Sequence, residues 1–211
     1  MAVLVPSYWA AYGPWNFLFL CDVALLLTLA AIWLENALLT SIVAVGITLP
    51  QFLWVFDFMP RGRIVDMAGY MFDSNLSLFA RGLSLFHGWL PLLVLWMVAR
   101  LGYDRRALAC QSLLTAALLV VCYSLAPAPP APVDDPDTAV NINYVHGLGF
   151  DEPQAWMPPL AWLSMLVVGL PLVVYLPTHL VLIRTFPRSG QSVGADAGFD
   201  ANTAETDATP G

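Results

Sequence analysis

The chain contains no lysine, and all eight of its basic residues are arginine. Charged residues of either sign make up only 11% of the 211 residues, whereas about a quarter is usual in a soluble domain. The net charge of −7 argues against nucleic acid as a partner, because binding phosphates needs basic patches. The lack of lysine beside an Asp- and Thr-rich tail is typical of a GC-rich or salt-loving prokaryote.

The motifs of familiar metal and cofactor chemistry are also missing. There is no HExxH, Walker loop, GxSxG or CxxC, and the three histidines are far apart in the sequence. The cysteines are odd in number and lie within apolar stretches, where they read as small buried hydrophobic residues. We therefore expect no metal and no cofactor, and we favour a protein that is not an enzyme without excluding one.

The chain does contain long apolar runs. Hydrophobic residues make up 59% of it, in blocks of about 20, which is the length that crosses a bilayer as a helix. The sequence thus predicts an all-α, polytopic transmembrane helix bundle. We expect about five spans, over residues 15–34, 37–58, 74–99, 107–126 and 159–182.

The segments outside these spans differ in character. Residues 1–14 lack a basic start and a cleavage site, and their aromatic residues suit the membrane interface. Asp73, Ser74 or Asn75 can cap the third helix. Residues 127–158 form a long outside loop, and the acidic tail at 183–211 is too polar to bury a core, so we predict that it is disordered.

Arginine placement predicts the orientation, since cytoplasmic loops retain basic residues. With five spans, the arginines at 100–106 and 184–188 fall on one side, opposite the acidic loop at 127–158. This puts the N-terminus outside the cell membrane and the C-terminus in the cytoplasm. Arg61 and Arg63 contradict it, and a sixth, re-entrant or short span between residues 64 and 81 would remove the conflict.

Prolines inside the predicted spans should bend them. Each proline lacks an N–H and so leaves the carbonyl four residues earlier unpaired, as at Pro50, Pro91, Pro171 and Pro177. A free carbonyl in hydrocarbon costs several kcal/mol unless a neighbour or a water meets it. Three of five helices are therefore expected to bend, either as packing kinks or around a polar cavity.

Titratable groups favour the cavity. An intramembrane acid or histidine is expensive and usually faces a partner, and we expect Asp22 to pair with His87 in the outer half of the bilayer. Asp57 ends the second span nearby. The echo of SLFARG in SLFHG, seven residues later, puts Ser77 and Ser84 on one helix face. The candidate polar pocket is thus Asp22, Asp57, Ser77, Ser84 and His87; the alternative for each is a structural hydrogen bond.

A second candidate site lies in the outside loop. Asn141, Asn143, Tyr144 and His146 are good hydrogen-bonding residues, and nearby glycines permit a tight turn. A loop of this length without secondary structure is uncommon unless it is functional or disordered. We expect it to fold back over the outer mouth of the bundle; the alternative is an ordinary connection.

Three functions fit these features. The first is an accessory or small-ligand- or lipid-binding membrane protein with an outward-facing polar pocket. The second is a small transporter or channel subunit that uses Asp22 and His87 in a polar path. The third is a membrane enzyme acting on a lipid or isoprenoid, with His87 as base and Asp22 orienting it. The bilayer is the expected partner in each case, and a homo-oligomer or a larger membrane complex is a further option.

Overall fold

The structure is a computed structural model that describes residues 1–74 and 76–190, so most of the predicted tail lies outside the described residues. In the described part every regular element is a helix, and the predicted all-α class is confirmed. Within residues 1–74 and 76–190, four helical stretches are long and apolar enough to cross a membrane, and Leu20–Leu34 is a shorter apolar helix. The four are Ala37–Phe58, Leu78–Leu101, Ala107–Leu125 and Pro159–Thr185.

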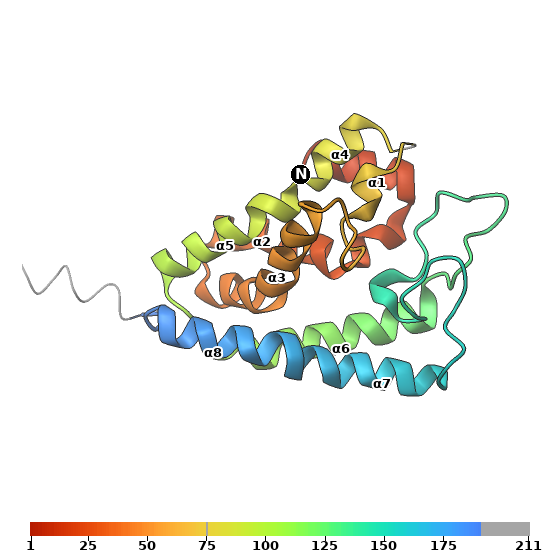
Figure 1. Ribbon diagram of the computed structural model, residues 1–211. Helices are drawn as coiled ribbons and strands as arrows, with labels where there is room; N and C mark the ends of the chain where they lie inside the picture. Colours follow the sequence, from red (N-terminus) through yellow and green to blue (C-terminus); the bar gives the residue numbers. More distant parts are fainter. Residues whose placement is uncertain (75, 191–211) are drawn as a thin grey trace, which may run out of the picture.

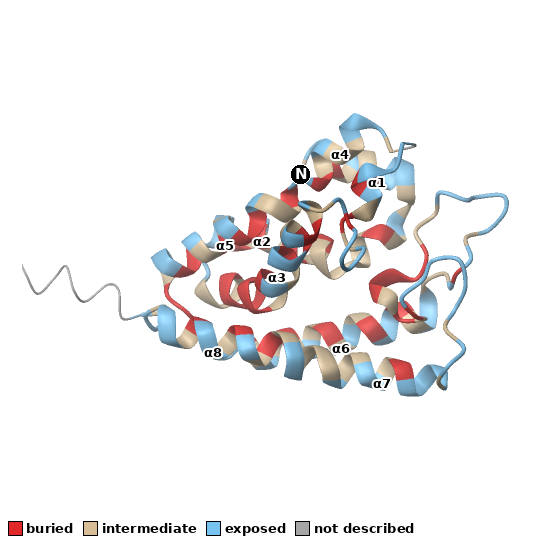
Figure 2. Ribbon diagram, in the orientation of Figure 1, coloured by how far each residue is buried: buried red, intermediate tan, exposed pale blue. Residues whose placement is uncertain are grey.

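The helices form two layers (Figure 1). One layer contains α2 (Leu20–Leu34), α3 (Ala37–Phe58) and α5 (Phe86–Leu101), and the other contains α6 (Ala107–Leu125) with α7 (Pro159–Gly169) and α8 (Leu176–Thr185). Helix α3 contacts α2, α5, α6 and α8, and it is the most deeply buried of the long helices (Figure 2). It is therefore the centre on which the other helices pack.

The N-terminal part is more broken than the sequence predicts. Helix α1 (Leu4–Tyr12) is followed by a 3₁₀ turn, η1 (Pro14–Leu18), and α2 begins only at Leu20. With 15 residues, α2 is about 22 Å long at 1.5 Å per residue. This is less than the roughly 30 Å hydrocarbon thickness, so residues 15–34 do not form one continuous span.

Local caps set the helix ends around the second and third spans. Asn36 begins α3 by accepting a hydrogen bond from the Leu39 N–H at 3.0 Å, after α2 ends at Glu35 in the left-handed conformation. Ser77, rather than Asp73 or Ser74, caps α4 (Leu78–Ser84) by accepting from the Ala80 N–H; the third candidate, residue 75, is outside the described residues.

Among the described residues between α3 and α4, the regular structure is a 3₁₀ turn, η2 (Gly69–Phe72), and no membrane-length helix is formed there. Helix α4 is separated from α5 by Leu85, six residues before Pro91. Both Pro50 and Pro91 lie inside helices that continue through them. The last span is different, because α7 and α8 are joined by a π-helical segment, η4 (Leu170–Tyr175), which contains Pro171.

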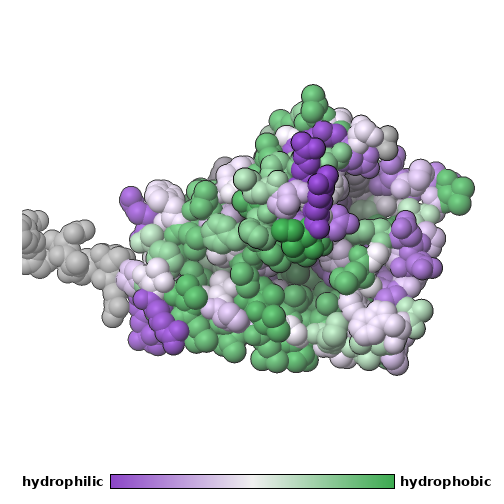
Figure 3. Space-filling model, in the orientation of Figure 1, coloured by the Kyte–Doolittle hydropathy of each residue, from purple (hydrophilic) through white to green (hydrophobic). Residues whose placement is uncertain are grey.

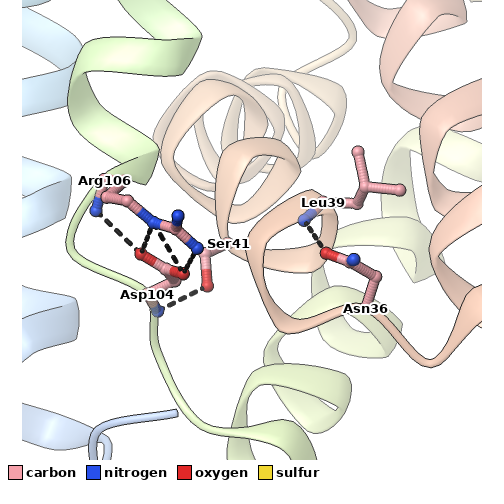
Figure 4. A network of polar contacts seen from close by, with 5 residues as sticks. All are labelled: Asn36, Leu39, Ser41, Asp104 and Arg106. Carbon is pink, nitrogen blue, oxygen red and sulfur yellow. Dashed lines mark hydrogen bonds and ion pairs between the residues drawn. The ribbon is translucent and has the colours of Figure 1, made fainter.

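The loop between α5 and α6 is fixed to α3. The Asp104 N–H donates to Ser41 Oγ at 2.9 Å, and the Arg106 guanidinium pairs with the Asp104 carboxylate at 2.8 Å (Figure 4). The hydrogen bonds from Arg106 lower the pKa of Asp104. Figure 3 shows apolar side chains over the middle of one face, with hydrophilic residues toward its margins. This distribution is the one that a membrane-spanning bundle requires.

Candidate functional site

The expected pair between Asp22 and His87 is not formed. His87 Nδ1 instead bonds the Ser84 carbonyl oxygen at 2.8 Å, and its ring stacks on Trp54 with 5.0 Å between ring centroids. Asp22 Oδ2 accepts a long hydrogen bond from Asn16 Nδ2 at 3.4 Å, while Oδ1 is buried without a partner. The reason is local: the carbonyl at the interruption between α4 and α5 lies three residues before His87 and satisfies the ring.

Asp22 nevertheless belongs to a group of polar side chains. The Tyr8 and Ser84 hydroxyls are 3.1 Å apart, which joins α1 to α4. Burial raises the pKa of Tyr8 to about 12, and the charge of Asp22 adds to this shift. We call this group the polar cluster; its members are Tyr8, Asn16, Asp22 and Ser84.

Asp57 has a different role from the one its position predicts. Its side chain is fully buried, and its two carboxylate oxygens accept four backbone N–H groups at 2.9–3.1 Å. The donors are Ile64, Val65, Met67 and Ala68. The carboxylate therefore organises the segment that follows α3, and its acceptor capacity is filled by that segment.

Ser77 also lies apart from the polar cluster. It is exposed, and its hydroxyl is used as the cap of α4. The seven-residue echo does place Ser77 and Ser84 at the two ends of α4, but only Ser84 is buried. The sequence pattern could not show this, because the helix is interrupted at Leu85, within the second copy.

The loop over residues 127–158 folds onto the bundle through Asn141. Its side chain accepts the His146 N–H at 2.9 Å and donates to the carbonyl oxygens of Gly147 and Gly149. The residue is fully buried and adopts a left-handed conformation with φ 49°. These bonds close residues 141–149 into a compact turn.

Asn143 connects this turn to the start of α2. Asn143 Oδ1 accepts the Leu20 N–H at 2.8 Å, and Asn143 Nδ2 donates to the Leu18 carbonyl oxygen at 2.8 Å. Phe19, at the usual cap position of α2, makes no side-chain cap. A loop residue 123 positions later in the sequence thus caps this helix.

Tyr144 and His146 fix the other side of the turn. The Trp162 indole N–H donates to the Tyr144 carbonyl oxygen at 2.8 Å, which holds the turn against α7. The His146 ring stacks on Tyr123 of α6 with 5.2 Å between centroids. His146 Nε2 is buried without a partner, and burial lowers the pKa of His146. All four loop residues therefore have structural contacts.

An apolar groove lies beside the polar cluster, with a volume of about 310 Å³. It is lined by residues of α2, α4 and α5, together with Met1, Val3 and Leu4 of the N-terminal segment. Its floor is buried and its rim is exposed, for Trp89 is 50% and Ile32 45% accessible. The floor residues are Leu4, Leu25, Thr28, Phe86 and Leu90.

The groove and the polar cluster share three segments. Leu4 is one helical turn from Tyr8, and Leu25 is one turn from Asp22, so each pair lies on one helix face. Leu83 lines the groove and directly precedes Ser84. The polar cluster therefore adjoins the groove on these three segments.

A separate set of polar side chains lies deeper in the bundle. Gln111 Nε2 donates to the Thr115 hydroxyl at 3.1 Å, and that hydroxyl is 2.8 Å from the Tyr175 hydroxyl in the π-helical segment. Gly46 permits this contact, because a Cβ there would come within 2.6 Å of Gln111 Nε2. The neighbouring void between α2, α3 and α6 measures about 10 Å³, the least that one water needs.

Sequence reasoning missed several of these residues. Tyr8 lies in a segment that reads as interfacial, and nothing in the sequence indicates its contact with Ser84. Gln51 did carry a signal, since an amide directly after Pro50 interrupts an apolar run. Among the described residues, no group of three His, Cys, Asp or Glu side chains could hold a metal.

Comparison of the chain with protein-family models, with curated proteins and with solved structures finds no match. The functional argument therefore depends on the geometry of the groove and of the polar cluster.

Proposed function

We propose that this protein binds the hydrocarbon chain of a membrane lipid in the groove between α2 and α5, with the lipid head at the polar cluster. The observation that supports the proposal is that Tyr8, Asp22 and Ser84 each lie within one helical turn of a groove-lining residue, and that the Tyr8 and Ser84 hydroxyls are in contact. The volume of about 310 Å³ is at the lower end of the range for small-molecule sites, about 300–1,000 Å³. This supports one chain rather than a whole two-chain lipid.

The bilayer setting decides what each part of the site contributes. Lipid tails are as apolar as leucine, so moving a chain from the bilayer into the groove removes little apolar surface from water. The favourable free energy of binding must therefore come from close packing. Its exposed rim gives a chain access from the surrounding lipid. Discrimination between lipids then comes from the polar end, where buried groups need partners.

The two alternative functions have less support. A transport path needs connected polar space, but the void beside Gln111 is about 10 Å³ and the Gln111–Thr115–Tyr175 groups bond one another. A second copy or a larger complex would have to complete such a path. The enzyme alternative needs Asp22 to orient His87, whereas His87 Nδ1 is held by the Ser84 carbonyl.

The proposal can be tested with two matched glycine substitutions. Gly82 lines the groove, Gly88 does not, and a Cβ at either position meets no heavy atom within 4 Å. Both variants should fold, because Phe has a better helix propensity than Gly. With a photoreactive fatty-chain probe in bilayers, we expect Gly82→Phe to reduce crosslinking to α2 and α5 at least fivefold and Gly88→Phe to leave it unchanged. Equal labelling of both variants would refute chain binding in this groove.

We also propose that the bundle lies in the cell membrane, of a prokaryote by its composition, with the polar cluster and residues 127–158 on the outside. The supporting pattern is the acidic 127–158 segment at one end and the arginines near α8 at the other. In a background lacking the native cysteines, a membrane-impermeant thiol reagent should label a cysteine at the exposed Asp135 in intact cells. A cysteine at the exposed Arg105 should react only after the cells are opened. The reverse labelling pattern would indicate the opposite topology and would leave the proposal of chain binding in the groove unchanged.

A further inference from the structure

Exposed arginines gather at one end of the bundle, where α5 and α8 end and the loop before α6 begins (Figure 1). Arg100 lies in the last turn of α5, and Arg184 lies in the last turn of α8. Arg105 belongs to the loop before α6, and Arg188 follows α8. All four side chains are exposed. We call these four residues the arginine surface.

The backbone of Tyr103 joins the two chain segments that carry this surface. Its N–H donates to the Pro187 carbonyl oxygen at 2.8 Å, and its carbonyl oxygen accepts the Ser189 N–H at 3.2 Å. These bonds lie on either side of Arg188, which forms a parallel β-bridge with Tyr103. Gly102 permits the close approach, because a Cβ there would lie 2.6 Å from Ser189 Cα. Arg188 is therefore held beside the loop before α6.

The side chain of Tyr103 makes a third connection, to α8. Its hydroxyl lies 2.7 Å from His179 Nδ1, and Tyr103 is only 1% exposed. The charge of Arg105 also acts on the His179 ring, so Arg105 lies on the same side of the bundle. The bond from the Asp104 N–H to Ser41 fixes the loop to α3 as well. The arginines are thus carried by segments that are tied to one another.

The arginine surface has an excess of positive charge. The carboxylate of Asp104 is already paired with Arg106 at 2.8 Å. Within residues 1–74 and 76–190, no member of the arginine surface forms an ion pair. Glu35, at the turn between α2 and α3, is the other acid that the described residues place at this end. Five arginines, including Arg106, therefore accompany two acids.

The same surface lies at the edge of the apolar part of the bundle. The Arg100 guanidinium is 5.7 Å from the centre of the Trp96 ring, and Trp96 is 58% exposed. Tryptophan is enriched where the hydrocarbon of a bilayer meets the head groups. The arginines also follow helical stretches that are long and apolar enough to cross a membrane. They therefore lie at the level of the lipid phosphates.

We infer that the arginine surface binds the head group of an anionic phospholipid. A guanidinium presents its N–H donors in a planar fork that matches two oxygens of one phosphate. A head group without a cation of its own leaves that phosphate charge for the arginines. In the proposed topology the surface faces the cytoplasmic leaflet, whose surface potential is negative. This surface is separate from the groove, and the inference does not depend on chain binding there.

The test compares phosphatidylglycerol with phosphatidylcholine of the same chains, each added to the full chain in detergent micelles. Both lipids have a phosphate, but only phosphatidylglycerol has a net negative charge, and identical chains make any binding in the groove equal. By native mass spectrometry, we expect phosphatidylglycerol to bind at least tenfold more tightly. Inorganic phosphate at the same concentration should not displace it. Equal binding of the two lipids would overturn the inference, and displacement by inorganic phosphate would identify free phosphate as the ligand instead.

Paired substitutions assign this preference to the arginine surface. An arginine near an anionic membrane surface contributes about fivefold to binding, so Arg105→Gln with Arg188→Gln should reduce the preference at least fivefold. Arg61→Gln with Arg63→Gln is the matched control, because it removes the same charge beyond the other end of α3. The control should change the preference less than twofold. Equal losses in the two double variants would show an effect of net charge and would overturn the inference.

Gly102→Ala tests the positioning of the arginines without changing any charge. The added Cβ meets Ser189 Cα and should separate Arg188 from the loop before α6. We expect the preference for phosphatidylglycerol to fall at least threefold. Binding equal to that of the wild type would show that the arginines act as independent charges and would refute a surface held together by Tyr103.

A second experiment separates the lipid from a competing partner within the chain. Residues 191–211 contain four acids and no basic residue, and they follow Arg188 closely in the sequence. Their charge is removed in the full chain by Asp196→Asn, Asp200→Asn, Glu205→Gln and Asp207→Asn together. The preference for phosphatidylglycerol should then be at least as strong as in the wild type. A preference that appears only in this variant would show that the acidic segment occupies the surface, and the inference would fail.

Discussion

The cap that Asn143 supplies to α2 makes a quantitative prediction. Its side chain makes two hydrogen bonds of 2.8 Å, one to the Leu20 N–H and one to the Leu18 carbonyl. Loss of a helix cap costs about 0.5–2 kcal/mol, and an unpaired, partly buried carbonyl costs about 1–3 kcal/mol. We therefore expect Asn143→Gly to lower the free energy of unfolding by about 2–4 kcal/mol.

Two further substitutions separate the contributions of the two hydrogen bonds and of the backbone conformation at residue 143. Asn143→Asp keeps an acceptor for the Leu20 N–H, at a helix end where negative charge is favourable, and loses the donor that bonds the Leu18 carbonyl at 2.8 Å and Cys122 Sγ at 3.5 Å. It should cost about 1–3 kcal/mol, less than the glycine variant. Asn143→Ala loses both bonds and must also hold φ 57°, so it should be about 0.5–1 kcal/mol less stable than glycine.

The assay is reversible unfolding in mixed micelles, read with protease cleavage of residues 127–158. The expected order of stability is wild type, Asp, Gly and then Ala, with cleavage rising in the same order. Val133→Ala is the control, since Val133 is fully exposed in the same segment and should change neither readout. If Asn143→Ala is as stable as the wild type, Asn143 does not cap α2 in the way described. The same conclusion follows if Asn143→Asp lowers the free energy of unfolding as much as Asn143→Ala does.

Three other predictions concern buried polar contacts. Asp57→Ala should leave four backbone donors of the following segment unpaired and make residues 60–68 the first site of protease cleavage. Unchanged cleavage would show that the Asp57 carboxylate does not hold this segment in place. Gly46→Ala should destabilise the bundle by about 1–3 kcal/mol through its clash with Gln111, and a double-mutant cycle should show that Gln111→Ala relieves most of that cost; strict additivity would contradict the contact. Burial lowers the pKa of His146, so on acidification the unfolded chain takes up this proton at a higher pH than the folded chain does. The free energy of unfolding should therefore be at its full value above about pH 6.5 and should decrease as the pH falls toward the pKa of the folded state. His146→Phe keeps a ring on Tyr123 and removes the unpartnered Nε2, so unfolding at several pH values should show a more stable variant that lacks this dependence.

The long helices could be predicted from the sequence because their signal is local. An apolar run of bilayer length defines α3 and α6 almost to the residue, and Glu35–Asn36 marks the turn between α2 and α3. The interruption before Leu20 could not be predicted in this way. Asn143 bonds both sides of it, and a local pattern cannot connect that residue to a helix 123 residues earlier.

The candidate site was predictable in its composition but not in its partners. Asp22 and Ser84 are buried together with other polar groups, as polar residues in an apolar run suggest. Asp57 and His87 took nearer partners, respectively the backbone of the next segment and the carbonyl three residues back. A single sequence does not show which backbone groups a loop or a helix break leaves free, and those groups decide the pairing.

The bond between Asn143 and α2 also has a consequence for biogenesis. The ribosome adds about 5–20 residues per second, so the asparagine emerges roughly 6–25 s after the helix that it completes. During that interval the first turn of α2 lacks this hydrogen bond, and Asp22 lies two residues beyond Leu20. The start of α2 is therefore completed only when the region after α6 has been translated.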